Sequence, residues 1–207
     1  SLITLTQMII MSLIFGKFIS FLYKRGVNKY ILFFVLLYFT ILPVHAFYSI
    51  SNWKDVIFSG LVLLLTMELV KLLEKKTITF RNSYTFIIIS ILTVFFRNNA
   101  IYMYIILAII TLIVFRKQIK TIGLMLLIVF VVYFGVKGPI YSYFNVKSSS
   151  STEYLAIPLQ QLGRMAYKGV EFTEEEEELI NELIPLETLR NSYNPEIVDS
   201  IKFNDEY

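Results

Sequence analysis

The segment Trp53-Lys54-Asp55 places a cation and a carboxylate side by side at the start of an apolar run. A lysine ammonium can bind a phosphate, and a neighbouring aspartate can orient a substrate or accept a proton from it. A structural alternative carries equal weight: an interfacial tryptophan followed by a Lys-Asp pair that begins a helix. On the chemical interpretation, Asp55 is the catalytic candidate and Lys54 is a substrate-binding candidate.

The segment Arg97-Asn98-Asn99 forms a short polar break between two apolar runs. Arginine suits bidentate contact with a phosphate, and the two asparagines can bind sugar hydroxyls. The same asparagines can instead satisfy backbone groups of a tight hairpin, and the two interpretations are again of equal weight. A polar residue inside a membrane span usually indicates a functional site, but this inference is weaker for a residue at the end of a span.

A third group of polar candidates lies in the last third of the chain. It comprises the substrate-binding candidates Glu153, Gln160, Gln161 and Arg164. Gln160 and Arg164 are four residues apart and would share one face of a helix. The pattern slightly favours the simpler interpretation, an amphipathic helix with a solvated polar face.

The sequence offers little for a metal site. It has one histidine and no cysteine, which excludes multi-histidine and thiolate sites. His45, close to Pro43, is interpreted as an interfacial residue and not as a proton relay. The acidic run 174–178 lacks the spacing of an EF-hand and is expected to begin a solvated helix. No metal ligand is assigned, and a divalent cation remains an open choice of cofactor.

Helices must position these candidates, because the sequence is too apolar for a soluble domain. Hydrophobic residues make up 56% and charged residues 17% of its 207 residues, against roughly 45–50% and about 25% in soluble domains. A spanning helix needs about 20 mostly apolar residues. The predicted fold is an all-α polytopic membrane bundle of about six spans, at residues 2–23, 30–48, 56–73, 84–96, 100–115 and 121–136.

Charge is distributed unevenly along the chain and predicts its orientation. Residues 1–144 carry a net charge of +11 and residues 145–207 a net charge of −8. The first, third and fifth connections between spans hold three Lys or Arg each, whereas the other two hold one each. The positive-inside rule then places the odd-numbered connections in the cytoplasm and residues 145–207 outside. The basic residues form short clusters and no stripe, so nucleic acid is not an expected partner.

The acidic segment 145–207 has helical signals of its own. A helix is expected from near Ile157 to Gly169, and Thr173 with Glu176 matches a capping box that would begin a second helix. A third short helix is expected over 185–191. Five apolar residues of this region are predicted to form a small core or to lie on the membrane surface: Leu179, Ile180, Leu183, Leu186 and Leu189.

Several strings together resemble a family of uncharacterised polytopic membrane proteins of Gram-positive bacteria, often associated with surface polysaccharides. They are WKDVIF, RNNA, EYLAIPLQQLGRM, FTEEEEELI and YNPEIVDSIKF. That family is similar to glycosyltransferases of the GT-C class, which take a sugar from a polyprenyl-phosphate donor on the outer face of the membrane. The resemblance implies that Lys54, Arg97 and Arg164 hold the lipid phosphate. It also implies a main catalytic acid in an earlier outer loop, with Asp55 a second acidic residue or a structural one.

Three functions follow as hypotheses. The first is a multi-pass glycosyltransferase of the bacterial cell membrane, with the lipid bilayer and a polyprenyl-phosphate sugar as partners. The second is a non-catalytic scaffold that binds a partner through the acidic segment. The third is a transporter or flippase, which the mostly apolar midplane positions disfavour. The chain begins with Ser1 and ends in a polar stretch, so it is expected to be a fragment of a longer protein.

Overall fold

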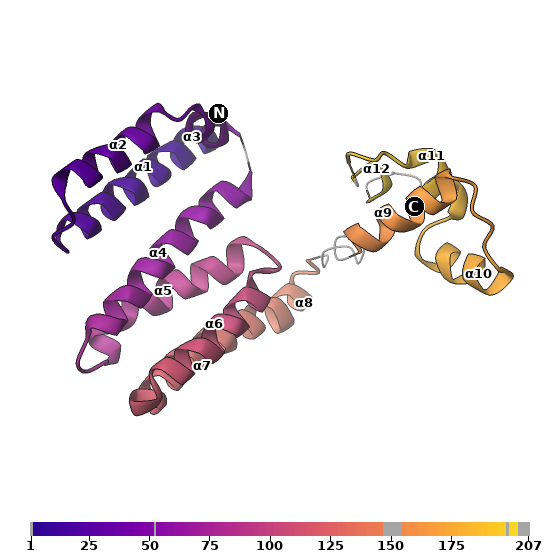
Figure 1. Ribbon diagram of the computed structural model, residues 1–207. Helices are drawn as coiled ribbons and strands as arrows, with labels where there is room; N and C mark the ends of the chain where they lie inside the picture. The colour runs from indigo at the N-terminus through magenta and orange to yellow at the C-terminus, as the bar shows by residue number, and fades with distance from the viewer. Residues whose placement is uncertain (1, 52, 147–154, 198, 203–207) are drawn as a thin grey trace. The chain divides into compact units, whose positions relative to one another are not determined.

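The computed structural model describes residues 2–51, 53–146, 155–197 and 199–202, and every regular element in these ranges is a helix (Figure 1). The chain divides into two compact units, Ser1–Phe144 and Asn145–Tyr207, called the membrane unit and the tail unit below. The boundary falls where the charge of the sequence changes sign.

The membrane unit consists of antiparallel helices joined by short loops. Its first part contains α1 (Leu2–Tyr23), α2 (Lys29–Ile41), α3 (Pro43–Ile50) and α4 (Lys54–Glu74). Next come α5 (Phe80–Phe96) and α6 (Ala100–Val114). The last run, Arg116–Tyr143, is one continuous helix made of a 3-10 turn, α7 (Ile119–Gly135), a π turn and α8 (Tyr141–Tyr143).

Two helices are bounded differently from the predicted spans because of proline. The predicted span 30–48 is bent by 49° between α2 and α3. Leu42 is extended because a residue before proline avoids the helical conformation, and Pro43 then begins α3 as its first residue. The predicted span 121–136 instead continues through Pro139 to Tyr143, because the π turn Val136–Ile140 accommodates the missing N–H of the proline.

The helix predicted at residues 84–96 begins four residues earlier, at Phe80. The Asn82 side chain accepts a hydrogen bond from the Thr79 backbone N–H at 2.9 Å and forms a capping box with that residue. The third helical position of this capping box holds Asn82, where Glu or Gln is usual, so the box was not recognised in the sequence.

Among the described residues, three helices are long and apolar enough to cross a membrane: Leu2–Tyr23, Lys54–Glu74 and Arg116–Tyr143. The bent pair α2–α3 would make a fourth, and α5 and α6 are apolar but shorter. The predicted number of six spans is therefore not established by length and composition.

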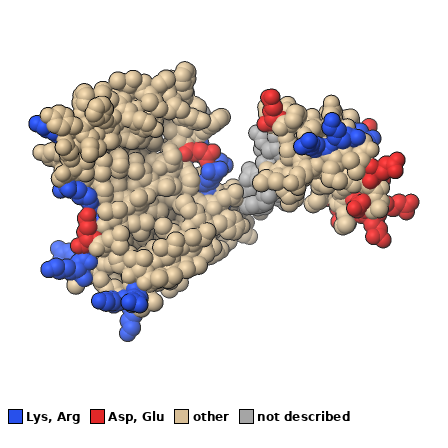
Figure 2. All heavy atoms as spheres, in the orientation of Figure 1, with Lys and Arg blue, Asp and Glu red and all other residues tan. Residues whose placement is uncertain are grey.

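The surface of the membrane unit suits a bilayer. Large apolar side chains are widely exposed, among them Phe34 at 68% and Val131 at 61%. Figure 2 shows the charged side chains of this unit gathered at the two ends of its helices, with an uncharged band between them. An apolar surface of this extent would promote aggregation in water but is expected where lipid is the solvent. The chain is therefore a helical membrane protein.

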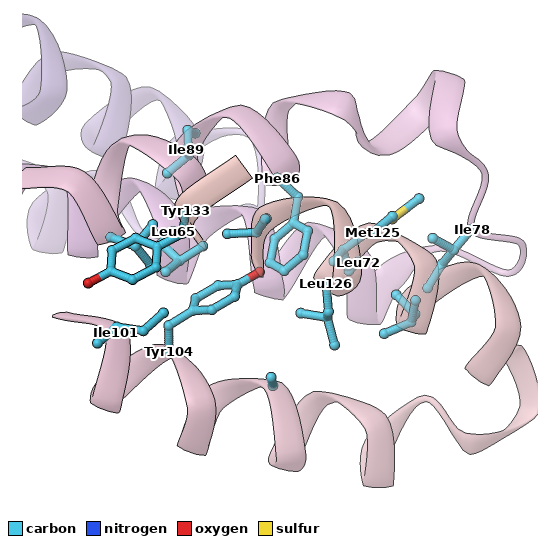
Figure 3. Packing of buried hydrophobic residues seen from close by; sticks show 14 residues of the cluster. Leu65, Leu72, Ile78, Phe86, Ile89, Ile101, Tyr104, Met125, Leu126 and Tyr133 are labelled. Atoms are coloured by element: carbon cyan, nitrogen blue, oxygen red, sulfur yellow. The ribbon is translucent and has the colours of Figure 1, made fainter. Parts of the chain in front are cut away.

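The core of the membrane unit lies between α4, α5, α6 and α7. Phe86, Tyr104 and Met125 are fully buried there, one from each of α5, α6 and α7. Figure 3 shows these side chains pointing into the space between the helices. The helix α5 packs against neighbouring helices in this core. Its short length is therefore compatible with a central place in the bundle.

The buried carboxylate of Glu68 pairs with Lys71 within α4 and links α4 to α5 through Thr85. The Glu68 carboxylate lies 2.5 Å from the Lys71 ammonium and accepts a hydrogen bond from the Thr85 hydroxyl at 2.6 Å. Glu68 and Lys71 are three residues apart and share one face of α4. Because both carboxylate oxygens have a partner, the charge of Glu68 is compensated in apolar surroundings.

The bundle end that carries the basic loops is held by polar contacts. Arg25 makes two parallel hydrogen bonds to Glu74, at 2.7 and 2.5 Å, and so ties the end of α1 to the end of α4. The Gln118 side chain accepts a hydrogen bond from the Ile78 backbone N–H at 2.6 Å. This contact joins the loop after α6 to the loop before α5.

The tail unit contains α9 (Ala156–Tyr167), α10 (Glu174–Leu183), α11 (Leu186–Ser192) and α12 (Asp199–Lys202). The sequence did not predict α12. Among its described residues, the tail unit has a core of six buried side chains: Leu159, Ala166, Ile180, Ile184, Leu189 and Ile201. Of the five apolar residues weighed above, Ile180 and Leu189 are in this core and Leu186 packs against it, whereas Leu179 and Leu183 are exposed.

Two local signals of the tail unit are confirmed. Gly169 has φ +74 after the end of α9, where only glycine is unstrained. Thr173 and Glu176 form the capping box of α10. Hydrogen bonds from the Thr173 backbone N–H and hydroxyl hold the pKa of the Glu176 carboxyl below its usual value.

We expect Gly163→Val to loosen the tail unit. A Cβ at Gly163 would lie 2.8 Å from Ile201 Cδ1 and 3.0 Å from Tyr193 Cδ2, so the substitution forces α9 away from its neighbours. Overpacking of this kind costs about 1–3 kcal/mol, which would speed amide hydrogen exchange in α9 by about fivefold or more. Gly135→Ala is the control, because a Cβ there meets no atom within 4 Å. Unchanged exchange in the Gly163 variant would contradict the packing.

Candidate functional site

Gln7 organises the loop that leads into Trp53-Lys54-Asp55. Its side chain is only 3% exposed. Its amide nitrogen donates to the carbonyls of Tyr48 and Ser49, both at 3.2 Å, and of Ser51 at 2.7 Å. These are carbonyls at the C-terminal end of α3, which have no partner within the helix. Gln7 therefore fixes the end of α3 against α1, and sequence reasoning missed this residue.

Asp55 and Arg97, two of the predicted site residues, lie together. Arg97 Nε is 3.3 Å from Asp55 Oδ1, and both side chains are about half exposed, at 48% and 49%. Asp55 lies in the first turn of α4 and Arg97 directly follows α5. The negative charge of Asp55 thus lies at the N-terminal end of a helix and the positive charge of Arg97 at a C-terminal end, and the helix dipole favours both placements. The antiparallel packing of α4 on α5 brings these two ends together.

The remaining residues of the two polar segments lie around this pair. The Lys137 ammonium donates a hydrogen bond to Asn98 Oδ1 at 2.8 Å. Lys137 belongs to the π turn, and its contact with Asn98 adds a second cation to this end of the bundle. Lys54 and Asn99 are exposed, at the starts of α4 and α6. Lys137 was not selected from the sequence, because its contact with Asn98 is a tertiary one.

A cavity of about 500 Å³ lies between α1, α3 and α4, with Asp55 in its wall. Typical ligand pockets measure about 300–1,000 Å³. Its lining is mostly apolar and aromatic: Met11, Phe15, Val44, His45, Tyr48, Ser49, Trp53, Asp55, Val56, Ser59, Gly60 and Leu63. The floor forms where α1 approaches α4 closely at Gly60, since a Cβ there would lie 2.7 Å from Ile14 Cδ1.

His45 lines this cavity within a cage of aromatic rings. The ring centroids of Phe15, Tyr38 and Phe39 lie 5.6, 5.1 and 5.3 Å from that of the imidazole. His45 Nε2 is buried without a hydrogen-bond partner among the described residues. Its place in the cavity gives it a larger candidate role than the sequence suggested, because a bound molecule would have to satisfy this nitrogen.

The third group of predicted residues belongs to the tail unit. Gln160, Gln161 and Arg164 line a common groove of about 790 Å³. Glu153 lies outside the described residues. The structure describes the membrane unit and the tail unit separately, so these residues form a second candidate site in their own right.

Neither site groups the ligands that a metal ion needs. Among the described residues, no three His, Cys, Asp or Glu side chains are close enough together to hold a metal.

The fold and the site define a helical membrane protein whose aromatic cavity ends at an ion pair. The chain belongs to a family of unknown function (DUF6020), which matches residues 1–204. No curated protein and no solved structure matches the chain. The family description names no activity, and the function is therefore argued from the site.

We expect Gln7→Leu to release the segment that carries Trp53. The substitution removes the Gln7 donor from three partly buried carbonyls, of which that of Tyr48 keeps the Ser51 hydroxyl at 2.8 Å, at a cost of about 1–3 kcal/mol. Trp53 is the single tryptophan of the chain, so its fluorescence anisotropy reports on this loop and should fall. Thr6→Ala, on the neighbouring residue of α1, removes an exposed intrahelical bond and should change nothing. An anisotropy equal to that of the wild type would contradict the role of Gln7.

Proposed function

We propose that this protein is a membrane glycosyltransferase of bacterial surface polysaccharide assembly that takes its sugar from a polyprenyl-phosphate donor at the outer face. One observation carries the proposal: a mostly apolar and aromatic cavity between α1, α3 and α4 has Asp55, which is paired with Arg97, in its wall. A substrate with an apolar chain, a phosphate and a sugar matches this sequence of environments.

Each part of such a donor has a complementary surface. The isoprenoid chain would lie in the bilayer and against the aliphatic and aromatic lining of the cavity. The phosphate would bind Arg97, which offers two parallel N–H donors, with Lys54 exposed nearby. Asn98 and Asn99 would supply hydrogen bonds to sugar hydroxyls.

The proposed chemistry uses the Asp55–Arg97 pair as a switch between free and loaded states. A bound phosphate competes with Asp55 for Arg97, and the aspartate is then free to accept the proton of an acceptor hydroxyl. The acceptor oxygen bonds to the anomeric carbon while the bond from that carbon to the phosphate oxygen breaks. The polyprenyl phosphate leaves with the electron pair, and Arg97 stabilises its charge.

The proposal includes six spans and a defined orientation. The helices α5 and α6 are about 25 and 22 Å long at 1.5 Å per residue, somewhat less than a typical hydrocarbon core of about 30 Å. Local thinning of the bilayer accommodates such helices at modest cost. The loops that hold Arg25, Lys76 and Lys117 then face the cytoplasm, and the Asp55–Arg97 end and the tail unit face outside.

Transport or lipid flipping is the second candidate. The bend between α2 and α3 resembles the discontinuous helices of transporters, and Glu68 is a buried charge inside the bundle. Both carboxylate oxygens of Glu68 already have partners, which favours a structural role for this residue.

We expect Arg97→Ala to weaken binding of a polyprenyl-phosphate sugar to the detergent-solubilised protein by about tenfold or more, because a charge-assisted contact to the phosphate is lost. Asp55→Asn should retain binding, since it removes the competing carboxylate, but should abolish sugar transfer to an acceptor. The two variants thus separate phosphate binding from proton transfer.

Arg81→Ala is the matched control, because Arg81 is an exposed arginine at the opposite end of the same helix, α5. It should bind the donor as well as the wild type does. Equal binding by all three variants would remove Arg97 from the phosphate site. Binding of no lipid-linked sugar by well-folded wild type would leave the glycosyl proposal without its substrate.

The orientation predicts which positions a membrane-impermeant maleimide can reach in intact cells. The chain has no cysteine, so single-cysteine variants need no background removed. Asn99→Cys and Glu175→Cys should be labelled directly, whereas Lys76→Cys and Lys117→Cys should react only after permeabilisation. The reverse pattern would place the Asp55–Arg97 pair in the cytoplasm, where the proposed donor does not present its sugar.

A further inference from the structure

The tail unit carries an open groove whose chemistry is unlike the rest of its surface. The groove lies between α9 and the loop that follows α11, and its volume is about 790 Å³. The unit as a whole is strongly acidic, with a net charge of −8 over residues 145–207. Figure 2 shows its Lys and Arg side chains gathered over one part of the unit, apart from most of the acidic ones.

Two cations line the groove near the end of α9, Arg164 in its last turn and Lys168 directly after it. Arg164 and Lys168 are four residues apart, which corresponds to about 6 Å along the helix axis. Both are exposed, and neither forms an ion pair with a described carboxylate. In a unit with thirteen acidic residues in its sequence, two cations without a described acidic partner offer a localised anion-binding surface.

Two tyrosine rings lie beside these cations. The ring centroids of Tyr167 and Tyr193 are 5.4 Å apart, and both residues line the groove. The Tyr167 side chain is 60% exposed, so its ring is accessible to a ligand. An exposed aromatic face can stack on the apolar face of a flat ring, and its hydroxyl can donate a hydrogen bond.

Amide and carboxylate groups complete the lining. Gln160 donates a hydrogen bond to the Asn194 carbonyl at 2.6 Å and so holds the second wall of the groove to α9. Gln161 is exposed in the first wall, and Glu196 is exposed in the second. An amide offers both donors and an acceptor, whereas a carboxylate offers only acceptors.

We propose that this groove is a binding site for an acidic saccharide chain. Carboxylate or phosphate groups of the chain would pair with Arg164 and Lys168, and the sugar rings would stack on Tyr167. Sugar hydroxyls would donate to Glu196 and exchange hydrogen bonds with Gln161. This inference stands on the tail unit alone and does not depend on the proposed glycosyl transfer in the membrane unit.

The presence of Glu196 favours a saccharide over an acidic peptide. A carboxylate in the groove repels a ligand that carries only acidic groups, but it binds a ligand that also carries hydroxyl donors. The groove is open to solvent, which leaves room for a chain that extends beyond the site.

The test is binding of hexagalacturonate to the full chain in detergent, measured by calorimetry. Maltohexaose, which is neutral, and hexaglutamate, which is acidic but has no hydroxyls, are the comparison probes. We expect hexagalacturonate to bind at least about tenfold more tightly than either. Equal binding of hexaglutamate would overturn the saccharide assignment in favour of an acidic peptide. No binding of hexagalacturonate would overturn the site for this ligand class.

Variants place the binding in the groove. Arg164→Gln with Lys168→Gln should weaken hexagalacturonate binding by about tenfold or more, and Tyr167→Ala should weaken it by a smaller factor. Glu175→Gln, outside the groove, changes the charge of the same unit and should have no effect. Helical circular dichroism checks that each variant is folded. Binding that is unchanged in the double variant, or that responds equally to Glu175→Gln, would overturn the proposal.

Discussion

A hydrocarbon environment offers no partner to a polar group, and this constraint determines where chemistry can occur in the membrane unit. Peptide groups are satisfied within helices, so most charged side chains lie at the helix ends. Glu68 lies deeper in the bundle and has partners for both oxygens in Lys71 and Thr85. The ends are then joined by polar contacts, which fix the register of one helix against the next. The candidate site is one of these joined ends.

The two ends of the membrane unit differ in their polar contacts, and the cavity lies at the Asp55 end. At the basic end, Arg25 and Glu74 close the packing of α1 on α4 with paired hydrogen bonds. At the opposite end, Asp55 and Arg97 make one longer contact of 3.3 Å above an aromatic cavity. An ion pair that is half exposed contributes little to stability, about 0–1 kcal/mol. It can therefore be exchanged for a substrate phosphate at small cost, which is the basis of the proposed function.

Local signals in the sequence predicted local structure well. Each apolar run became a helix, and the capping box at Thr173 and the glycine stop at Gly169 were found because they depend on neighbouring residues. Proline was ambiguous: Pro43 interrupts one predicted span, whereas a π turn carries the helix through Pro139. The cavity could not be predicted, because it depends on Gln7 reaching carbonyls more than forty positions away. His45 and Lys137 acquire their roles only through such tertiary contacts. Membership of a family of unknown function does not identify the reaction.

Photocrosslinking with a lipid-linked sugar tests the central claim most directly, namely that the cavity beside Asp55 and Arg97 holds the donor. The probe is a polyprenyl-phosphate sugar with a diazirine on the isoprene units nearest the phosphate, and the crosslinked peptides are identified by mass spectrometry. We expect the crosslinks to be concentrated in α1, α3 and α4, the helices that line the cavity. We expect these crosslinks to be lost in Arg97→Ala. Crosslinks spread evenly over the lipid-facing helices, and unchanged in that variant, would contradict the central claim.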